Sequence, residues 1–237
     1  WKYAPLFMDR SEALDYFNRK SMPELAEGLK DKFAPLRRST VNRLGQSAKF
    51  KADPAIIQSI ENLANTEKEK TTKAAAIAFL AKTKDTRYKS LYDKNINDSS
   101  YSVAGAALTG LKELEPAKAY DLAKKYSSDA KGDLGDAINE VLMAEGTEAD
   151  FDLLASRYEK MPLSQEKVGA SATFAGYLEK VQNIANVKKG IDLIIKFRNL
   201  VPEQFRSFVD PTIKGGLSKL SKAKGKEIED YIGDKLK

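Results

Sequence analysis

The sequence predicts an all-α protein, and three observations carry that prediction. Apolar residues recur at helical spacing along much of the chain, as Ile56, Ile60 and Leu63 do. Prolines stand where helices would begin, as Pro54 does after the capping residue Asp53. No stretch alternates apolar and polar residues with β-branched enrichment, and the hairpin dipeptides Asn-Gly and Asp-Gly do not occur.

The expected helices follow one another along the whole chain. We expect two or three short helices within 9–50. The segment 53–160 has the clearest helical pattern. One long helical stretch is expected from about 164 to 200, followed by two terminal helices near 203–220 and 224–236.

Local signals mark several helix boundaries. Pro116 stands at a position typical of a first helical residue. Asp150 follows Thr147 by three residues, which is the spacing of a capping box. Pro162 and Pro202 mark breaks between helices, since proline has no backbone N–H to continue a helix.

The middle of the chain repeats with a period of about 31 residues. Three segments rich in small residues align on Leu80, Leu111 and Val141, which are 31 and 30 residues apart. The segments that follow them align on leucines spaced by 31 residues: Leu91, Leu122 and Leu153. Each repeat therefore reads as one helix rich in small residues, a turn, and a helix with leucine and aromatic residues.

A single helical pair of this kind cannot bury both of its apolar faces, but a stack of pairs can. We therefore predict an α-solenoid of HEAT-like helical hairpins with atypical terminal helices. The whole chain, 1–237, is expected to form one domain. Its parts are N-terminal helices in 1–50, HEAT-like repeats in 53–160 and capping helices in 163–237.

Two residue types are missing, and their absence excludes much chemistry. The chain has neither cysteine nor histidine. It therefore has no thiol nucleophile, disulfide or Ser-His-Asp triad, and no zinc site built on Cys or His. We expect no catalytic residue, no metal ligand and no cofactor-binding residue in this chain. The lack of cysteine fits any compartment, so the sequence predicts none.

The net charge of +6 hides a mixed distribution. Only nine of the 40 basic residues are Arg, the residue that nucleic-acid sites prefer. The middle segment, 51–150, has 14 basic and 17 acidic residues. This pattern favours a solvated surface over a nucleic-acid site. The longest apolar run, Ala74–Ala81, is far shorter than the ~20 residues that a bilayer span needs, so we expect no membrane span.

The segment that begins at Asp93 briefly resembles a calcium loop. An EF-hand needs Gly at position six and Glu at position twelve, where this chain has Asp98 and Ala104. We interpret the segment as a polar turn in which Ser99 or Ser100 caps the next helix.

Aromatic residues recur through the repeats and are expected to pack between them, although exposed tyrosines could line a concave peptide-binding face. They are Tyr88, Tyr92, Tyr101, Tyr120, Tyr126, Phe151 and Tyr158.

The opening segment Tyr3-Ala-Pro-Leu-Phe-Met-Asp-Arg-Ser-Glu-Ala-Leu14 is the most distinctive stretch. It resembles the junction at which zinc aminopeptidases of the M1 (gluzincin) family pass into their C-terminal helical domain. The resemblance implies junction residues at Tyr3, Pro5, Asp9 and Arg10. We expect Asp9 to be an N-cap and Arg10 to reach toward an adjoining domain.

The resemblance also implies a function. The catalytic domain of that family carries a His-Glu-x-x-His zinc motif, which this chain lacks, so no catalytic residue carries over. A chain that starts at Trp1 is then expected to be part of a longer protein whose zinc lies upstream. The helical domain would cap the active-site cavity and restrict peptide entry, with the catalytic domain and peptide substrates as partners.

Two alternatives come from other functional classes. A free-standing HEAT-type scaffold would bind protein partners through the same helical surface. A nucleic-acid-binding helical repeat is suggested by the sequence pI of about 9.1, but the Lys-rich, acid-mixed composition argues against it.

Overall fold

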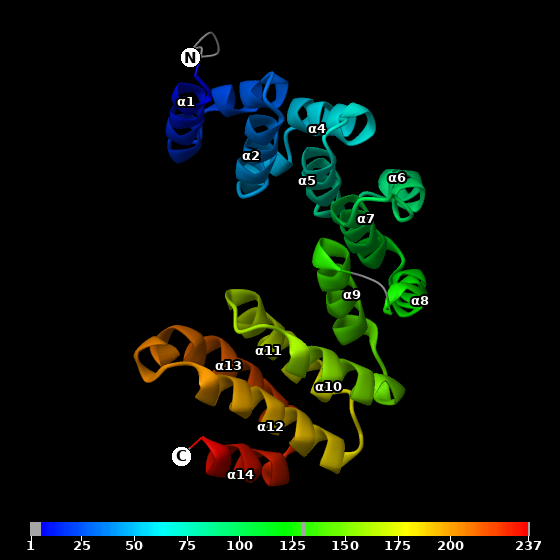
Figure 1. The fold of residues 1–237 in the computed structure, drawn as a ribbon, viewed down its shortest axis with the longest axis vertical. Helices are drawn as coiled ribbons and strands as arrows, with labels where there is room; N and C mark the ends of the chain where they lie inside the picture. Colours follow the sequence, from blue (N-terminus) through cyan, green and yellow to red (C-terminus); the bar gives the residue numbers. More distant parts are fainter. Residues whose placement is uncertain (1–5, 129–130, 237) are drawn as a thin grey trace. The chain divides into compact units, whose positions relative to one another are not determined.

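The computed structural model describes residues 6–128 and 131–236, and every regular element in these ranges is a helix (Figure 1). The all-α prediction is therefore confirmed. The chain divides into two compact units, Trp1–Ile138 and Asn139–Lys237. The division falls inside the helix α9 (Gly132–Glu145), so it needs no linker and leaves no compositional signal.

Unit 1 contains the following elements in chain order: α1 (Phe7–Arg19), η1 (Pro23–Lys30), α2 (Ala34–Leu44), α3 (Ala48–Lys51), α4 (Pro54–Thr66), α5 (Lys70–Ala81), η2 (Thr86–Tyr88), α6 (Lys89–Asn95), α7 (Tyr101–Leu114), α8 (Pro116–Tyr126) and the first part of α9. Unit 2 contains the rest of α9 and the following elements: η3 (Glu148–Asp150), α10 (Phe151–Lys160), α11 (Gln165–Leu178), α12 (Ile184–Leu200), α13 (Glu203–Lys224) and α14 (Lys226–Lys235). None of the described helices is both long and apolar enough to cross a membrane.

Two predicted boundaries are confirmed by side-chain hydrogen bonds. The Asp53 carboxylate accepts from the backbone N–H groups of Ala55 and Ile56, which caps α4. The Asp150 carboxylate accepts from the backbone N–H of Thr147 at 2.8 Å and from its hydroxyl at 3.0 Å, within the expected capping box. These bonds satisfy donors that a helix start leaves without backbone partners.

Other boundary predictions are wrong. The expected single stretch 164–200 is two helices, because Asn183 accepts from the backbone N–H groups of Ala185 and Asn186 and so begins α12. The serine cap before α7 is also replaced. Ser100 occupies the capping position without a side-chain bond, and the Asp98 carboxylate accepts from the Ser100 N–H instead.

Unit 1 has a row of helices with partners beside it. α5 packs between α2 and α7, and α6 and α8 both pack against α7 (Figure 1). α7 and α9 also approach closely, since a Cβ added to Gly105 would lie 2.6 Å from the backbone oxygen of Asp133. The first residues of α5, α7 and α9 are 70, 101 and 132, so these helices begin 31 residues apart.

The 31-residue period is present in the core, with one difference in register. Leu80, Leu111 and Val141 are fully buried. The aligned leucines of the second helices are not core residues, and Leu153 is 38 % exposed. The buried positions are the residues directly after them: Tyr92, Ala123 and Leu154.

Most of the repeat aromatics that we expected to pack inside do so. Tyr88, Tyr92, Phe151 and Tyr158 are buried, whereas Tyr101 is 47 % exposed. An aromatic ring that removes most of its area from water contributes strongly to a helical interface.

A buried ion pair holds the first helix of unit 1 in place. Arg10 on α1 donates to both carboxylate oxygens of Asp31, at 2.7 and 3.3 Å, and both side chains are about 95 % buried. Asp31 also accepts from the backbone N–H of Phe33, while Arg37 donates to its backbone oxygen. The pair therefore connects α1 with the turn between η1 and α2.

Replacing Asp31 with Ala should leave the Arg10 guanidinium buried without its carboxylate. We expect a loss of about 3–5 kcal/mol in the free energy of unfolding. Urea unfolding followed by circular dichroism measures this loss. The matched control, Lys226→Ala, removes one partner of an exposed pair with Asp230 and should have no measurable effect. Equal stability of D31A and K226A would contradict the structural role of Arg10.

Candidate functional site

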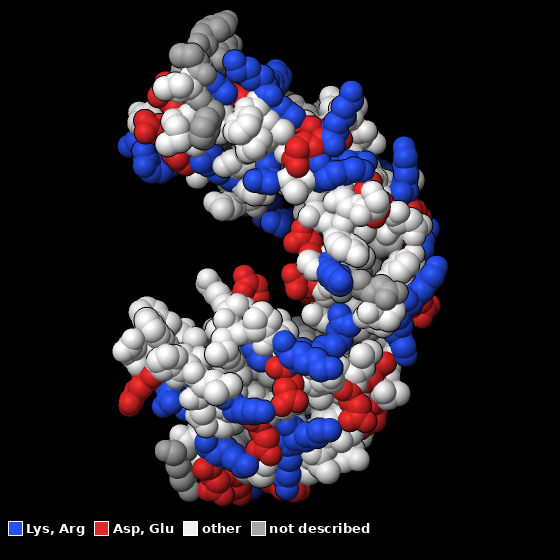
Figure 2. All heavy atoms as spheres, viewed as in Figure 1, with Lys and Arg blue, Asp and Glu red and all other residues white. Residues whose placement is uncertain are grey.

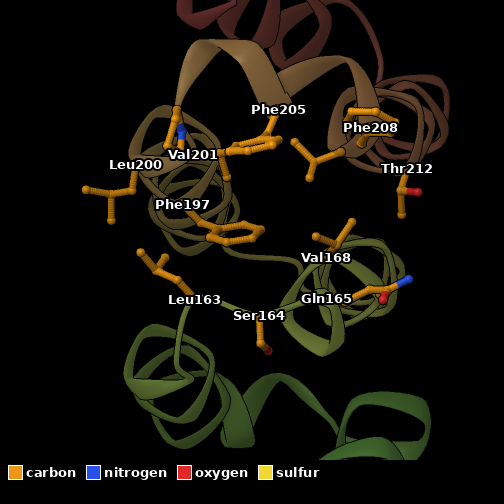
Figure 3. A pocket seen from close by; sticks show the side chains of 13 residues that line it. Leu163, Ser164, Gln165, Val168, Phe197, Leu200, Val201, Phe205, Phe208 and Thr212 are labelled. Carbon is orange, nitrogen blue, oxygen red and sulfur yellow. The ribbon is translucent and has the colours of Figure 1, made fainter.

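The candidate site is an apolar groove in unit 2 (Figure 3). It lies between the start of α11, the end of α12 and the first three turns of α13, and it encloses about 640 Å³. The side chains of Phe197, Phe205 and Val168 point toward one another across it (Figure 3). None of the residues that line it is charged.

The groove exposes large apolar side chains to water. Exposed fractions are 61 % for Leu163, 56 % for Leu200, 51 % for Phe205 and 77 % for Phe208. At about 200 Å² for each large side chain, these four expose roughly 400–500 Å² together. An apolar patch of this size on a soluble protein commonly marks an interaction site. In Figure 2 the surface over α11 and the start of α13 is largely uncharged, whereas Lys, Arg, Asp and Glu are interspersed elsewhere on this face.

The groove exists because only the second half of α13 packs on the rest of the unit. No residue of α13 before Ile213 is buried, whereas Ile213, Leu217 and Leu220 are core residues. Pro211 separates the halves, and since proline has no N–H, the helical hydrogen bond to the Ser207 carbonyl is missing. The first half of α13 is therefore free to stand away from α11 and leave a space.

Small residues set the distance between the second half of α13 and α11. A Cβ added to Gly216 would lie 3.1 Å from the Cα of Ala172 and 3.3 Å from the Cβ of Ala175. Such spacing leaves little room for a larger residue at this crossing. The neighbouring Gly215 faces open space.

Ionic contacts fix the first half of α13 to α12. Arg198 donates to both oxygens of Asp210, at 2.7 and 2.8 Å, and Lys214 lies 3.0 Å from the same carboxylate. Arg206 donates to the backbone oxygens of Val201 and Asn199 at the end of α12. Hydrogen bonds from Arg198 and then Lys214, opposed by partial burial, lower the pKa of Asp210 to about 2. Both ends of the groove wall are thus held in place.

The floor of the groove is supported from below by a buried lysine. Phe197 is only 3 % exposed, and the Lys167 ammonium lies 5.4 Å from the centre of its ring. Lys167 donates to the backbone oxygens of Glu159 and Met161 at the end of α10. Burial lowers the pKa of Lys167, and the two carbonyl oxygens and the ring face compensate for its lost hydration. The ammonium is therefore engaged with its own unit.

The predicted junction residues do not contribute to this groove. Tyr3 and Pro5 lie outside the described residues. The N-cap prediction for Asp9 is wrong, because α1 begins at Phe7 and Asp9 is an exposed residue of its first turn. Arg10 points into unit 1, where Asp31 binds it, so its described contacts are not with another domain.

The sequence analysis did not find the groove, although one signal was present. Phe205 and Phe208 follow Pro202 at helical spacing, in a segment with few other apolar residues to cover them. The residues of the calcium-like segment are engaged locally, since Asp93 pairs with Lys118 and Asp98 with Lys70. Within residues 6–128 and 131–236, no three carboxylates gather as a metal site would require.

Two adjacent glycines should respond oppositely to the same change. Gly215→Ala should raise the free energy of unfolding by about 0.5–1 kcal/mol, because alanine favours the helix and the new methyl meets no neighbour. Gly216→Ala should lower it by about 1 kcal/mol or more, because the methyl presses α13 away from α11. Thermal unfolding of both variants measures the difference. A gain in both variants would contradict the close packing.

Asp210 should make stability depend on pH in the acid range. Its folded pKa of about 2 lies below the ordinary value of 3.8, so its contribution is present above pH 4 and is lost as the pH falls toward 2. With screening by solvent, we expect Asp210→Asn to cost about 1 kcal/mol at pH 7 and nothing at pH 2. Urea unfolding at both pH values tests this. A cost independent of pH would assign the effect to packing.

Comparisons with known proteins give no relative for this chain. No model of a protein family matches it, and no curated protein does. The resemblance to M1 aminopeptidases therefore rests on the opening segment and the helical pattern, and the chemistry of the groove has to carry the functional argument.

Proposed function

We propose that this chain is a non-catalytic helical-repeat domain that binds an apolar segment of another polypeptide in the groove of unit 2. The exposed, uncharged lining of the groove carries the proposal, with Phe205 and Phe208 as its most prominent side chains. A groove without titratable side chains supplies no general acid or base, whereas it can take up apolar side chains.

The exposure of the groove favours a polypeptide over a small molecule. Small ligands are held in pockets that bury 70–90 % or more of their surface, on the order seen for drug-sized compounds. Here Phe208 and Leu163 are mostly exposed, so a small apolar ligand would remain partly in water. A polypeptide segment brings its own polar side chains to cover the outer surface.

The area of the patch argues against a second copy of this chain as the occupant. A standard stable interface buries about 800 Å² on each partner. The four exposed apolar side chains offer roughly 400–500 Å², which suits a short segment better than a self-associating surface.

Release of water supplies the driving force for binding. At about 30 Å³ per molecule, the groove volume of 640 Å³ corresponds to about twenty waters. These waters find few hydrogen-bonding partners on an apolar lining, and their transfer to bulk favours association. Binding should therefore show a negative change in heat capacity.

The helical arrangement of unit 1 supports the HEAT-like part of the proposal. α5, α7 and α9 begin 31 residues apart, and α6 and α8 pack on α7. Buried residues recur with the same period. Stacked helical hairpins of this type present extended surfaces to protein partners.

Placement of this domain downstream of an M1 zinc aminopeptidase stays a prediction. It rests on the segment Tyr3–Leu14 alone, and in that setting the apolar segment would belong to a peptide substrate. An upstream His-Glu-x-x-His motif in the parent reading frame would support it, and its absence would leave the scaffold function.

Peptides selected from a random phage-displayed library should depend on the groove. We expect selection on the full chain to enrich peptides with two or more large apolar residues. Synthetic copies should lose at least tenfold in affinity for Phe208→Asp and for Leu163→Ser, measured by fluorescence anisotropy. Both side chains are exposed, so neither change should unfold the protein.

The matched control is Leu153→Ser. Leu153 is an exposed leucine of α10 that does not line the groove, so its removal should leave the affinity unchanged. Equal losses for L153S and L163S, or enriched peptides that ignore F208D, would show that binding occurs elsewhere.

A further inference from the structure

The residues that line the groove recur at helical spacing on each of its three walls. α13 contributes Phe205, Phe208 and Val209, which are positions i, i+3 and i+4. α12 contributes three residues with the same spacing: Phe197, Leu200 and Val201. So does α11, with Gln165, Val168 and Gly169. A helix presents such a ridge to a neighbouring helix that packs against it.

Resting on the proposed function, we infer that the bound segment is an amphipathic helix that packs among α11, α12 and α13. The ridges of the three helices converge on one space, which no described helix of unit 2 occupies (Figure 3). The occupant would complete a local bundle of four helices.

The backbone of the occupant also favours a helix. An extended peptide in a groove needs partners for its N–H and C=O groups, which a free strand edge usually supplies. The described part of the chain contains no strand, and the walls of the groove are helices whose backbone groups are mostly bonded within the helix. An extended segment would lose hydration without compensation, whereas a helix satisfies its own backbone.

The groove sets the pattern that the helix must carry. Its lining is uncharged, so the buried face should have large apolar residues at i, i+3, i+4 and i+7 and no charge. The charges nearest in sequence to the lining are of both signs, with Glu166 and Glu203 beside Lys160 and Arg206. They favour no strong net charge on the exposed face of the partner.

Two synthetic 14-residue peptides test the inference. The first has Leu, Phe, Leu and Phe at i, i+3, i+4 and i+7 on an Ala, Gln, Lys and Glu background, with acetylated and amidated ends. The second is identical except for Pro at one central position on its polar face, which breaks the helix and keeps every apolar side chain. We expect the first to bind the full chain and the second to bind at least tenfold more weakly. Anisotropy measures affinity, and circular dichroism measures helix formation on binding.

The outcomes separate this inference from the proposed function. Equal binding of both peptides, lost in Phe208→Asp, would overturn the helical mode and leave the groove as a peptide site. Binding of the library-selected peptides alone, without helix formation, would have the same meaning. No binding by any of these peptides would overturn both.

Discussion

The close contact between α11 and the second half of α13 determines the rest of the candidate site. Gly216 allows α13 to approach the backbone of Ala172, and Ile213, Leu217 and Leu220 are buried beyond it. Pro211 interrupts the helical hydrogen bonds just before this contact, so the first half of α13 need not follow the same path. One half of the helix belongs to the core, and the other half forms a wall of an open groove.

The exposed wall carries an energetic cost that a protein stabilised only by its own core would avoid. Phe208 would contribute more to stability if buried, yet it is 77 % exposed. The ion pair between Arg198 and Asp210 and the supported ring of Phe197 hold the wall and the floor, so the apolar surface does not collapse on itself. A preorganised groove loses less entropy when a partner binds. The exposed surface and its rigid support therefore fit a binding site better than a packing defect.

Features that depend on local sequence were predictable, whereas those that depend on how helices meet were not. The caps at Asp53 and Thr147 follow from short-range hydrogen bonds, and the 31-residue period follows from repeated helix lengths. The core register was off by one, since the neighbours of the aligned leucines are buried instead. The groove lies beyond such reasoning, because it arises where α13 leaves α11. Arg10 was misread for a similar reason, as its partner Asp31 is 21 residues away.

Nuclear magnetic resonance of methyl groups tests the central claim most directly. The full chain, labelled at Leu and Val methyls, would be titrated with a library-selected peptide. The account predicts shift changes concentrated at Leu163, Val168, Leu200, Val201 and Val209, with buried leucines of unit 1 such as Leu80 and Leu111 unaffected. Changes centred on unit 1, with the five groove methyls unmoved, would contradict it.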